Sequence, residues 1–334
     1  MKIIISIFLL LSVFQVVGQT DIETMQETAR NFLRQKDYSN AQLVLKKAAQ
    51  LHPENLGILK DLAYVYYLNG NYETSKNVIS PLVDREDADV QTYQIAANIY
   101  KELNDIKTID KLYQKGLKKF PKSGALHFEY GEILLVKEQQ AEAIKIWEEG
   151  IKLDPSYSGN YYHASKYYYY SQKNIVWCLL YSEIFINLES YSMRTAEIKN
   201  QLLDAYKRFY VEQQLIPDTK KVHPFETAVF NLLTKQSDAT VSGITPSSLT
   251  TIRSKFIENW FNNTEPNFPY RLFDHWQQLL SGGMFDAYNQ WLFAGISNPS
   301  QFQEWQSKHV EEFKNFQYFQ KNRLFKMNLD QYYH

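Results

Sequence analysis

The sequence contains the residue types that most often act in catalysis and metal binding, but their spacing matches no known type of catalytic or metal site. The seven histidines are scattered, and no pair has the i, i+4 spacing with a glutamate that a zinc-binding helix needs. His309 and Glu312 would form a metal or acid–base cluster only if the fold brought Asp274 and His275 to them. No P-loop, G-x-S-x-G or G-x-G-x-x-G motif occurs. We therefore expect no catalytic residues, no metal site and no cofactor, and an enzyme seated in the C-terminal half is the alternative.

Charge and cysteine content narrow the functions further. Lys and Arg number 36 against 37 Asp and Glu, a net charge of -1, so no strong field draws nucleic acid or an anionic membrane to the protein. The single cysteine, Cys178, excludes an internal disulfide. It lies in the apolar run Val176–Leu180, whereas a reactive thiolate needs a charged, partly exposed setting. We predict a buried structural thiol.

The N-terminal stretch Met1–Gln19 has the composition of a secretory signal peptide. Lys2 supplies a positive charge, Ile3–Phe14 is almost wholly apolar, and Val16 and Gly18 are small enough for a cleavage site. An uncleaved membrane anchor is the alternative, but the apolar run is shorter than the roughly 20 residues that a spanning helix needs. No cysteine stands at the expected cut, which disfavours a lipid anchor. We expect an exported protein, periplasmic or secreted, with no transmembrane segment after cleavage.

From Met25 onward, residue types recur with a period of 34 residues through five copies. Each copy has apolar residues at steps of three and four, which place one apolar stripe on each of two helices. A small residue recurs where the two helices would cross, at Ala29, Ala63, Ala97, Gly131 and Ser165. Pro53, Pro121 and Pro155 end the second helices of their copies, because proline cannot continue the hydrogen-bond ladder. A single hairpin cannot bury its own apolar faces, so the copies are expected to stack.

This pattern resembles the tetratricopeptide repeat family, whose signature at the same period is W-x2-L-G-x2-Y…A-x3-F…P. The resemblance implies an all-α fold in which helical hairpins form a solenoid. Five repeats would cover residues 22–55, 56–89, 90–123, 124–157 and 158–191. The helical pattern continues through a connecting helix and linker, residues 192–221, into a divergent helical C-terminal domain, residues 222–334, within which residues near 269–302 fit a degenerate repeat.

Apolar periodicity and helix-starting prolines predict further helices in the C-terminal part. Their expected limits are Pro224–Lys235, Pro246–Asn262, Tyr270–Ser281, Met284–Ala294 and Pro299–Asn328. Gly and Pro are sparse, with 12 and 10 residues, which disfavours a sandwich or barrel full of tight turns. The C-terminal part is therefore expected to be helical as well.

In tetratricopeptide proteins, ligands usually lie along the concave face that the first helix of each hairpin lines. By spacing, the resemblance implies that this face presents Arg30, Arg34, Lys60, Tyr64, Tyr67, Gln94, Asn98, Lys101, Phe128, Glu132, Tyr162, Lys166, Tyr169 and Tyr170. Cations and amides can hold the backbone or carboxylates of an extended peptide, and tyrosine rings offer flat apolar area at low entropy cost. The sequence therefore predicts a scaffold or adaptor that binds another protein or a peptide without catalysis.

The tyrosine-rich run over residues 161–170 leaves a second reading open. Tyr161 and Tyr168 fall on the packing register and are expected in the core. Tyr162, Tyr169 and Tyr170 are expected to face the groove, where exposed rings could also stack on sugars. A glycan-binding repeat protein is therefore an alternative to a protein-binding one. A face that is merely solvated, or that the C-terminal domain covers, is the third reading.

Overall fold

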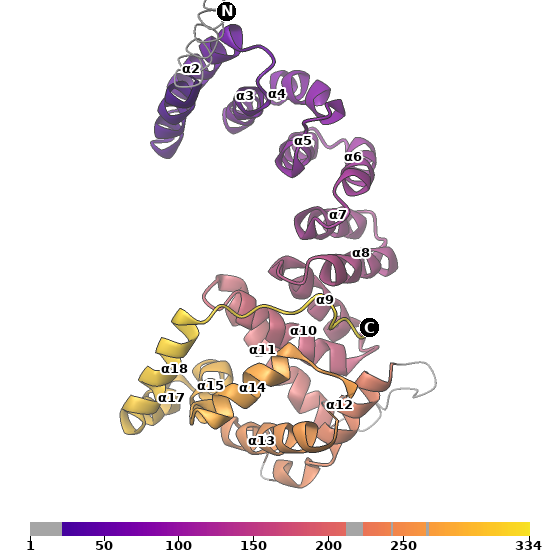
Figure 1. Ribbon diagram of the computed structural model, residues 1–334, viewed down its shortest axis with the longest axis vertical. Helices are drawn as coiled ribbons and strands as arrows, with labels where there is room; N and C mark the ends of the chain where they lie inside the picture. Colours follow the sequence, from indigo (N-terminus) through magenta and orange to yellow (C-terminus); the bar gives the residue numbers. More distant parts are fainter. Residues whose placement is uncertain (1–21, 212–222, 242, 265–266) are drawn as a thin grey trace, which may run out of the picture. The chain divides into compact units, whose positions relative to one another are not determined.

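The computed structural model describes residues 22–211, 223–241, 243–264 and 267–334, so the predicted signal peptide, Met1–Gln19, lies outside the described residues. Every regular element in these ranges is a helix (Figure 1), which confirms the predicted all-α fold. The chain divides into two compact units, one ending at Pro121 and the other running from Lys122 to His334. Each unit consists of helices joined mostly by short turns.

Consecutive helical hairpins build the first unit. A helix over residues 22–34 precedes α2 (Tyr38–Leu51), α3 (Leu56–Leu68), α4 (Tyr72–Ile79), α5 (Val90–Glu102) and α6 (Ile106–Lys119). A 3₁₀ turn, η1 (Ser80–Asp84), extends α4. Short polar side chains start several of these helices, because Asp37, Asn55 and Asp105 each accept a hydrogen bond from the backbone N–H three residues later.

The second unit begins in the same style and then becomes less regular. Its first helices are α7 (Gly124–Val136), α8 (Gln140–Leu153), α9 (Ser158–Ser171), α10 (Ile175–Leu188) and α11 (Met193–Val211). Further along lie α12 (Pro224–Thr234), η2 (Ser237–Thr240), α13 (Pro246–Asn263), α14 (Arg271–Ser281), α15 (Phe285–Asn289), the π-helical turn η4 (Gln290–Ala294), α16 (Gly295–Ser297), α17 (Pro299–Lys308) and α18 (Val310–Asn322). Residues 323–334 form an irregular segment after α18.

The repeat period of the sequence is also present in the backbone. Five turn residues adopt a left-handed conformation, with φ from 55° to 74°, at Lys36, Gly70, Asn104, Glu138 and Gln172. They are spaced 34 residues apart, and each lies just after the first helix of a copy. Only one of the five is glycine, the residue that adopts this conformation at least cost. The turn geometry, and not the residue type, therefore fixes the conformation at the other four positions.

Small residues of the repeat pattern are buried where helices cross. Ala29, Ala63 and Ala97 have at most 1% of their surface exposed. In the second unit, a Cβ atom on Gly131 would lie 2.0 Å from Nε1 of Trp147. That distance is far below van der Waals contact, so α7 and α8 can approach this closely only with glycine at the crossing. The close approach that the small residues were predicted to permit is confirmed at Gly131, and the three alanines are buried.

Predicted helix limits in the C-terminal part are correct for three segments and wrong for two. The first three agree within one residue with α12, α13 and α14, whereas the helix predicted to end at Ala294 continues through η4 and α16 to Ser297. The predicted single helix Pro299–Asn328 is two helices that break at His309, where φ is -126°, and the second ends at Asn322. The break brings the ring centroids of Phe302 and Phe313 to 5.6 Å. A straight helix would separate these two residues by about 16 Å along its axis, leaving both rings without this contact.

Cys178 lies on α10, in a stretch where residues 175–186 are all buried. Burial raises the pKa of its thiol to about 12, so the thiolate is scarce near neutral pH. The predicted burial of this thiol is thus confirmed. We expect Ellman's reagent to leave the folded protein unmodified at mildly alkaline pH and to modify one thiol after unfolding in guanidinium chloride. Rapid modification of the folded protein would contradict this assignment.

Candidate binding groove

Helix α9 presents its tyrosines in three directions. Tyr161 and Tyr168 are buried, as the packing register predicts. Tyr162 and Tyr169 bond to the neighbouring helix α11, whereas Tyr170 is 70% exposed. A helix has 3.6 residues per turn, so successive tyrosines cannot share one face. The run therefore divides into core rings, rings between helices and a surface ring.

Two matched sets of polar contacts join α9 to α11. The Tyr162 hydroxyl donates to Glu197 Oε2 at 2.7 Å. Seven residues further along each helix, the Tyr169 hydroxyl donates to Asp204 Oδ2 at 2.8 Å, and the Arg208 guanidinium carbon lies 4.2 Å from the centroid of the Tyr169 ring. Burial and the bond to Asp204 raise the pKa of Tyr169 to about 12, so its hydroxyl keeps its proton and remains a donor. These polar ends bind one another and are not free for a ligand.

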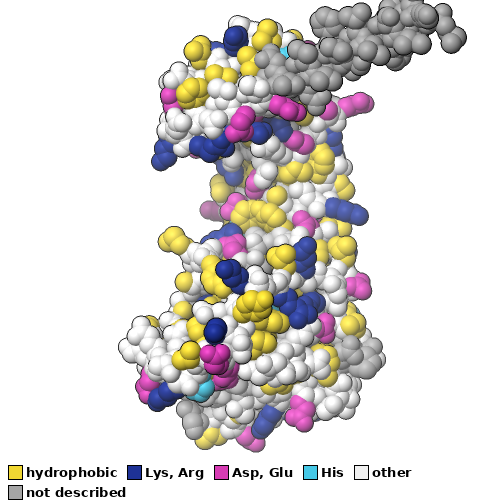
Figure 2. Space-filling view, turned by 60° about the vertical axis from the view of Figure 1, so that its left-hand side comes forward, with side chains coloured by type: hydrophobic (Ala, Val, Ile, Leu, Met, Phe, Trp, Pro, Cys, Tyr) yellow, Lys and Arg dark blue, Asp and Glu magenta, His cyan; other side chains and the backbone are white. Residues whose placement is uncertain are grey.

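An open groove lies between α9 and the α7–α8 hairpin. It encloses about 660 Å³, within the range of roughly 300–1,000 Å³ that is common for ligand pockets. The hairpin contributes Leu135, Gln140, Ala141 and Trp147, and α9 with the turn after it contributes His163, Lys166, Tyr167, Tyr170, Ser171 and Lys173. Figure 2 shows that hydrophobic and basic side chains share the face in view.

Contacts beneath the groove hold its floor in place. The Trp147 indole donates to the backbone oxygen of Phe128 at 3.2 Å, and its ring stacks on the His163 ring at a centroid distance of 4.6 Å. His163 also stacks on Phe128, and its Nε2 lies 3.3 Å from a Glu132 carboxylate oxygen. Because the indole N–H and the imidazole Nε2 already have partners, the floor offers an incoming group mainly apolar surface.

Apolar side chains are exposed at the mouth of the groove. Leu135 and Tyr170 line it and are both exposed, and Val136, the residue after Leu135, is exposed as well. Single exposed apolar residues are ordinary on protein surfaces, but several around one hollow indicate a binding site. This clustering makes the groove the candidate binding site of the second unit.

Part of the predicted ligand face is brought together here. Lys166 and Tyr170 line the groove, and Phe128 and Glu132 contact its floor through His163. The two tyrosines bonded to α11 lie outside the lining. Sequence reasoning did not identify Leu135, Trp147, Tyr167 or Lys173 as part of a site. The apolar pair at residues 135–136, at the end of a helix, was the signal that could have revealed the mouth of the groove.

Predicted ligand residues of the first unit lie on the helix over residues 22–34, on α3 and on α5. Arg30 and Arg34 are exposed, and Arg34 pairs with Glu27 at 2.7 Å. Lys60 is buried, and its ammonium group pairs with the Asp89 carboxylate. The other predicted residues are exposed or half-buried, namely Tyr64, Tyr67, Gln94, Asn98 and Lys101. The charge of Lys60 is thus matched within the protein, while the two arginines remain at the surface.

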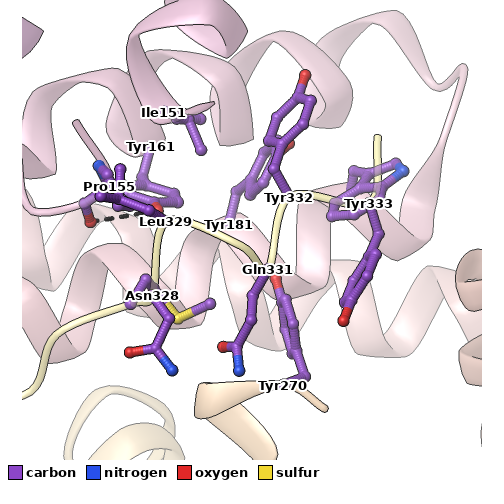
Figure 3. Close-up of a pocket in the computed structure, with 12 residues that line it drawn as sticks. Ile151, Pro155, Tyr161, Tyr181, Tyr270, Asn328, Leu329, Gln331, Tyr332 and Tyr333 are labelled. Carbon is purple, nitrogen blue, oxygen red and sulfur yellow. Dashed lines mark hydrogen bonds between the residues drawn. The ribbon is translucent and has the colours of Figure 1, made fainter. Parts of the chain in front are cut away.

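A second hollow in the unit after Lys122 is filled by the chain itself. Residues 327–333 pack against α9 and α10, where Tyr161 and Tyr181 face them (Figure 3). The side-chain oxygen of Gln331 accepts the backbone N–H of Arg271 at 2.7 Å and fixes this segment to the start of α14. Only about 10 Å³ remains open, so this hollow has no room for a ligand.

The residues of the acid–base alternative have other contacts. Glu312 accepts the backbone N–H of Ala287 at 3.0 Å, and His309 stacks on Trp305 at a centroid distance of 4.5 Å. His275 lies among aromatic rings, and burial lowers its pKa to about 3. In the described part of the chain, no group of three His, Cys, Asp or Glu side chains could hold a metal ion. In that same part, no helix is long and apolar enough to cross a membrane.

Known proteins resemble part of the chain. Residues 32–99 match the family model described as Tetratricopeptide repeat. Similar solved structures include TTC0263, a thermophilic tetratricopeptide protein of Thermus thermophilus. The two sequences are 12% identical, the alignment covers 55% of this chain and 98% of that chain, and the TM-score is 0.43. MamA from Desulfovibrio magneticus RS-1 has 13% identity, coverages of 51% and 94%, and a TM-score of 0.40. YrrB, a tetratricopeptide protein with an unusual peptide-binding site, has 15% identity, coverages of 53% and 90%, and a TM-score of 0.39.

No curated protein matches the chain. The family match nevertheless lies within the region where apolar residues, small residues and left-handed turns recur every 34 residues. These features agree on one kind of repeat. The chain therefore contains tetratricopeptide repeats, and the family match covers residues 32–99.

Proposed function

We propose that this protein is an exported adaptor that binds a segment of another protein in the groove between α9 and the α7–α8 hairpin. The observation that carries the proposal is the groove itself, about 660 Å³ in volume and open to solvent over an apolar floor. Its walls are helices and its floor is fixed by stacking, so little ordering cost opposes association. The proposed action is binding without chemistry.

Export rests on the composition of Met1–Gln19, with its basic start and apolar centre. Mass spectrometry of the protein recovered from its host tests this part separately. We expect an N-terminus at Gln19 or Thr20, since the small residue Gly18 lies just before these positions. An intact Met1 on the recovered protein would contradict cleavage.

Tyr170 is the side chain whose removal separates binding from folding. Its ring is 70% exposed at the groove, so truncation should change the free energy of unfolding by less than about 0.5 kcal/mol. An exposed aromatic residue that becomes buried by a partner commonly contributes strongly to affinity. We expect Tyr170→Ala to lower the affinity for groove-binding peptides about tenfold.

A displayed library of random peptides, selected on the full chain and followed by fluorescence polarisation, measures this effect. Tyr318→Ala is the matched control, because Tyr318 is 72% exposed on α18 and does not line the groove. The proposal predicts peptides that bind the wild type and Tyr318→Ala equally and Tyr170→Ala more weakly. Failure to select any peptide whose binding depends on Tyr170 would overturn it.

A further inference from the structure

Each wall of the groove carries apolar side chains, and the two walls lie on different elements. Leu135 and Ala141 come from the end of α7 and the start of α8, and Tyr167 and Tyr170 come from the last turns of α9. The Trp147 indole N–H between them already donates to a backbone oxygen. A polar group placed on this floor would lose water without gaining a hydrogen bond from the indole. The space therefore suits a large apolar side chain.

Among the described residues, the Lys, Arg, Asp and Glu side chains that line the groove are all basic. They are Lys166 and Lys173. Lys166 is matched, because its ammonium group lies 2.5 Å from Glu197 Oε1. Lys173 is exposed and has no ion-pair partner among the described residues. An incoming carboxylate near Lys173 would meet an attractive charge, whereas an incoming ammonium group would be repelled.

The lining is poorly suited to a sugar. Sugar hydroxyls need acceptors close to the stacking ring, and no Asp, Glu or Asn side chain lines the groove. Gln140 is the single carboxamide there. A glycan platform would use the ring faces of Tyr162 and Tyr169, but Lys166 lies over the first ring and Arg208 over the second. A protein segment, which brings its own large apolar side chain, suits these walls better.

We infer that the partner segment presents a large apolar side chain to the floor and carboxylates beside it, facing Lys173. This inference rests on the proposed function and specifies the chemistry of the partner at that same groove. It follows from two observations together, the apolar walls around Trp147 and the unmatched lysine at the rim.

Three fluorescein-labelled peptides test the inference with the full chain. One has a Leu-Trp centre flanked by Asp and Glu, the second has the same centre flanked by Lys, and the third has an Ala-Ala centre with acidic flanks. We expect the first to bind about tenfold more tightly than either of the others at low salt. Lys173→Glu should weaken the first peptide and strengthen the second, each by about threefold. Lys314→Glu, on α18 away from the groove lining, is the matched control and should change neither.

The outcomes separate this inference from the proposed function. One outcome is that the selected library peptides are neutral or basic and still require Tyr170 for binding. That result would overturn the inference but would agree with the proposed function. Equal affinity of the wild type for the acidic and basic peptides would also overturn the inference without contradicting the proposed function. Binding of maltoheptaose that is lost in Tyr170→Ala, without any peptide that depends on Tyr170, would overturn both.

Discussion

Arg253→Met is expected to destabilise the second unit by about 3–5 kcal/mol. Arg253 on α13 and Glu183 on α10 form an ion pair in which the side chains are 0% and 1% exposed. Methionine keeps much of the arginine volume but removes the charge. Glu183 would then be a buried carboxylate without a cation, which is the costly state that such pairs otherwise avoid.

Four elements of the unit meet at this pair. Glu183 Oε1 also accepts the Trp276 indole N–H at 2.6 Å and the Tyr288 hydroxyl at 2.7 Å. The Arg253 guanidinium donates to Asn289 Oδ1 and lies 4.3 Å from the centroid of the Trp276 ring. Helices α10, α13, α14 and α15 are thereby tied together through one carboxylate and one guanidinium. Loss of either the carboxylate or the guanidinium should therefore destabilise the packing of all four helices.

Tryptophan fluorescence during urea unfolding measures the loss of stability in the second unit. All six tryptophans lie after Lys122, so the signal comes from the second unit. The double variant Glu183→Gln/Arg253→Met is the control, since glutamine keeps an acceptor for Trp276 and Tyr288 but carries no charge. We expect the double variant to recover at least about 1 kcal/mol relative to the single one. Equal stability of the single variant and the wild type would contradict the assignment.

The destabilisation of Arg253→Met should depend on pH. Burial raises the pKa of Glu183, and the Arg253 charge opposes that shift. Without the cation, the folded-state pKa lies still further above the unfolded value of about 4.3. A carboxyl group with a raised folded-state pKa favours folding below its unfolded pKa, and this contribution is lost as the pH rises. The gap between variant and wild type should thus narrow at acidic pH and widen at neutral pH.

Gly131→Ala is expected to destabilise the second unit by about 2 kcal/mol. A Cβ at this position would lie 2.0 Å from Nε1 and 2.4 Å from Cε2 of Trp147, a buried ring that is 1% exposed. Alanine favours a helix over glycine by about 1 kcal/mol, but the clash with a fixed ring outweighs that gain. The same displacement would disturb the hydrogen bond from Trp147 to Phe128, on which the groove floor depends.

Gly295→Ala provides the comparison. A Cβ there would lie 3.5 Å from the nearest atom of Phe302, which is ordinary contact. We expect this variant to be as stable as the wild type or more stable by up to about 1 kcal/mol. Urea unfolding followed by tryptophan fluorescence reports both substitutions. A Gly131→Ala protein as stable as Gly295→Ala would show that α7 and α8 do not approach as closely as described.

Binding should respond to Gly131→Ala as well, even where the variant remains folded. Trp147 forms the groove floor, and its displacement would alter the space that receives a partner side chain. Peptides that depend on Tyr170 should therefore bind this variant less tightly. Gly295→Ala should bind them normally, because Gly295 does not line the groove.

Local patterns in the sequence were sufficient to predict the helices and their repeat. The signals used for this prediction are local: the spacing of apolar residues, a small residue such as Ala63 and a turn such as the one at Gly70. Each signal spans only a few residues, so the sequence of one copy is sufficient to predict its two helices. The same locality explains why a break could be missed. Nothing next to His309 signals the end of α17, because the contact that favours the break joins Phe302 to Phe313 across it.

Only the tertiary structure decided which side chains are free to bind. Lys60 and Tyr170 were both predicted to lie on the ligand face. In the structure, Lys60 is buried and pairs with Asp89, whereas Tyr170 is exposed beside an open groove. Glu183 and Arg253 stand 70 residues apart, and no local pattern relates them. Pairing, burial and grooves arise from how separate helices stack, and the sequence near a residue does not encode which distant helix will cover it.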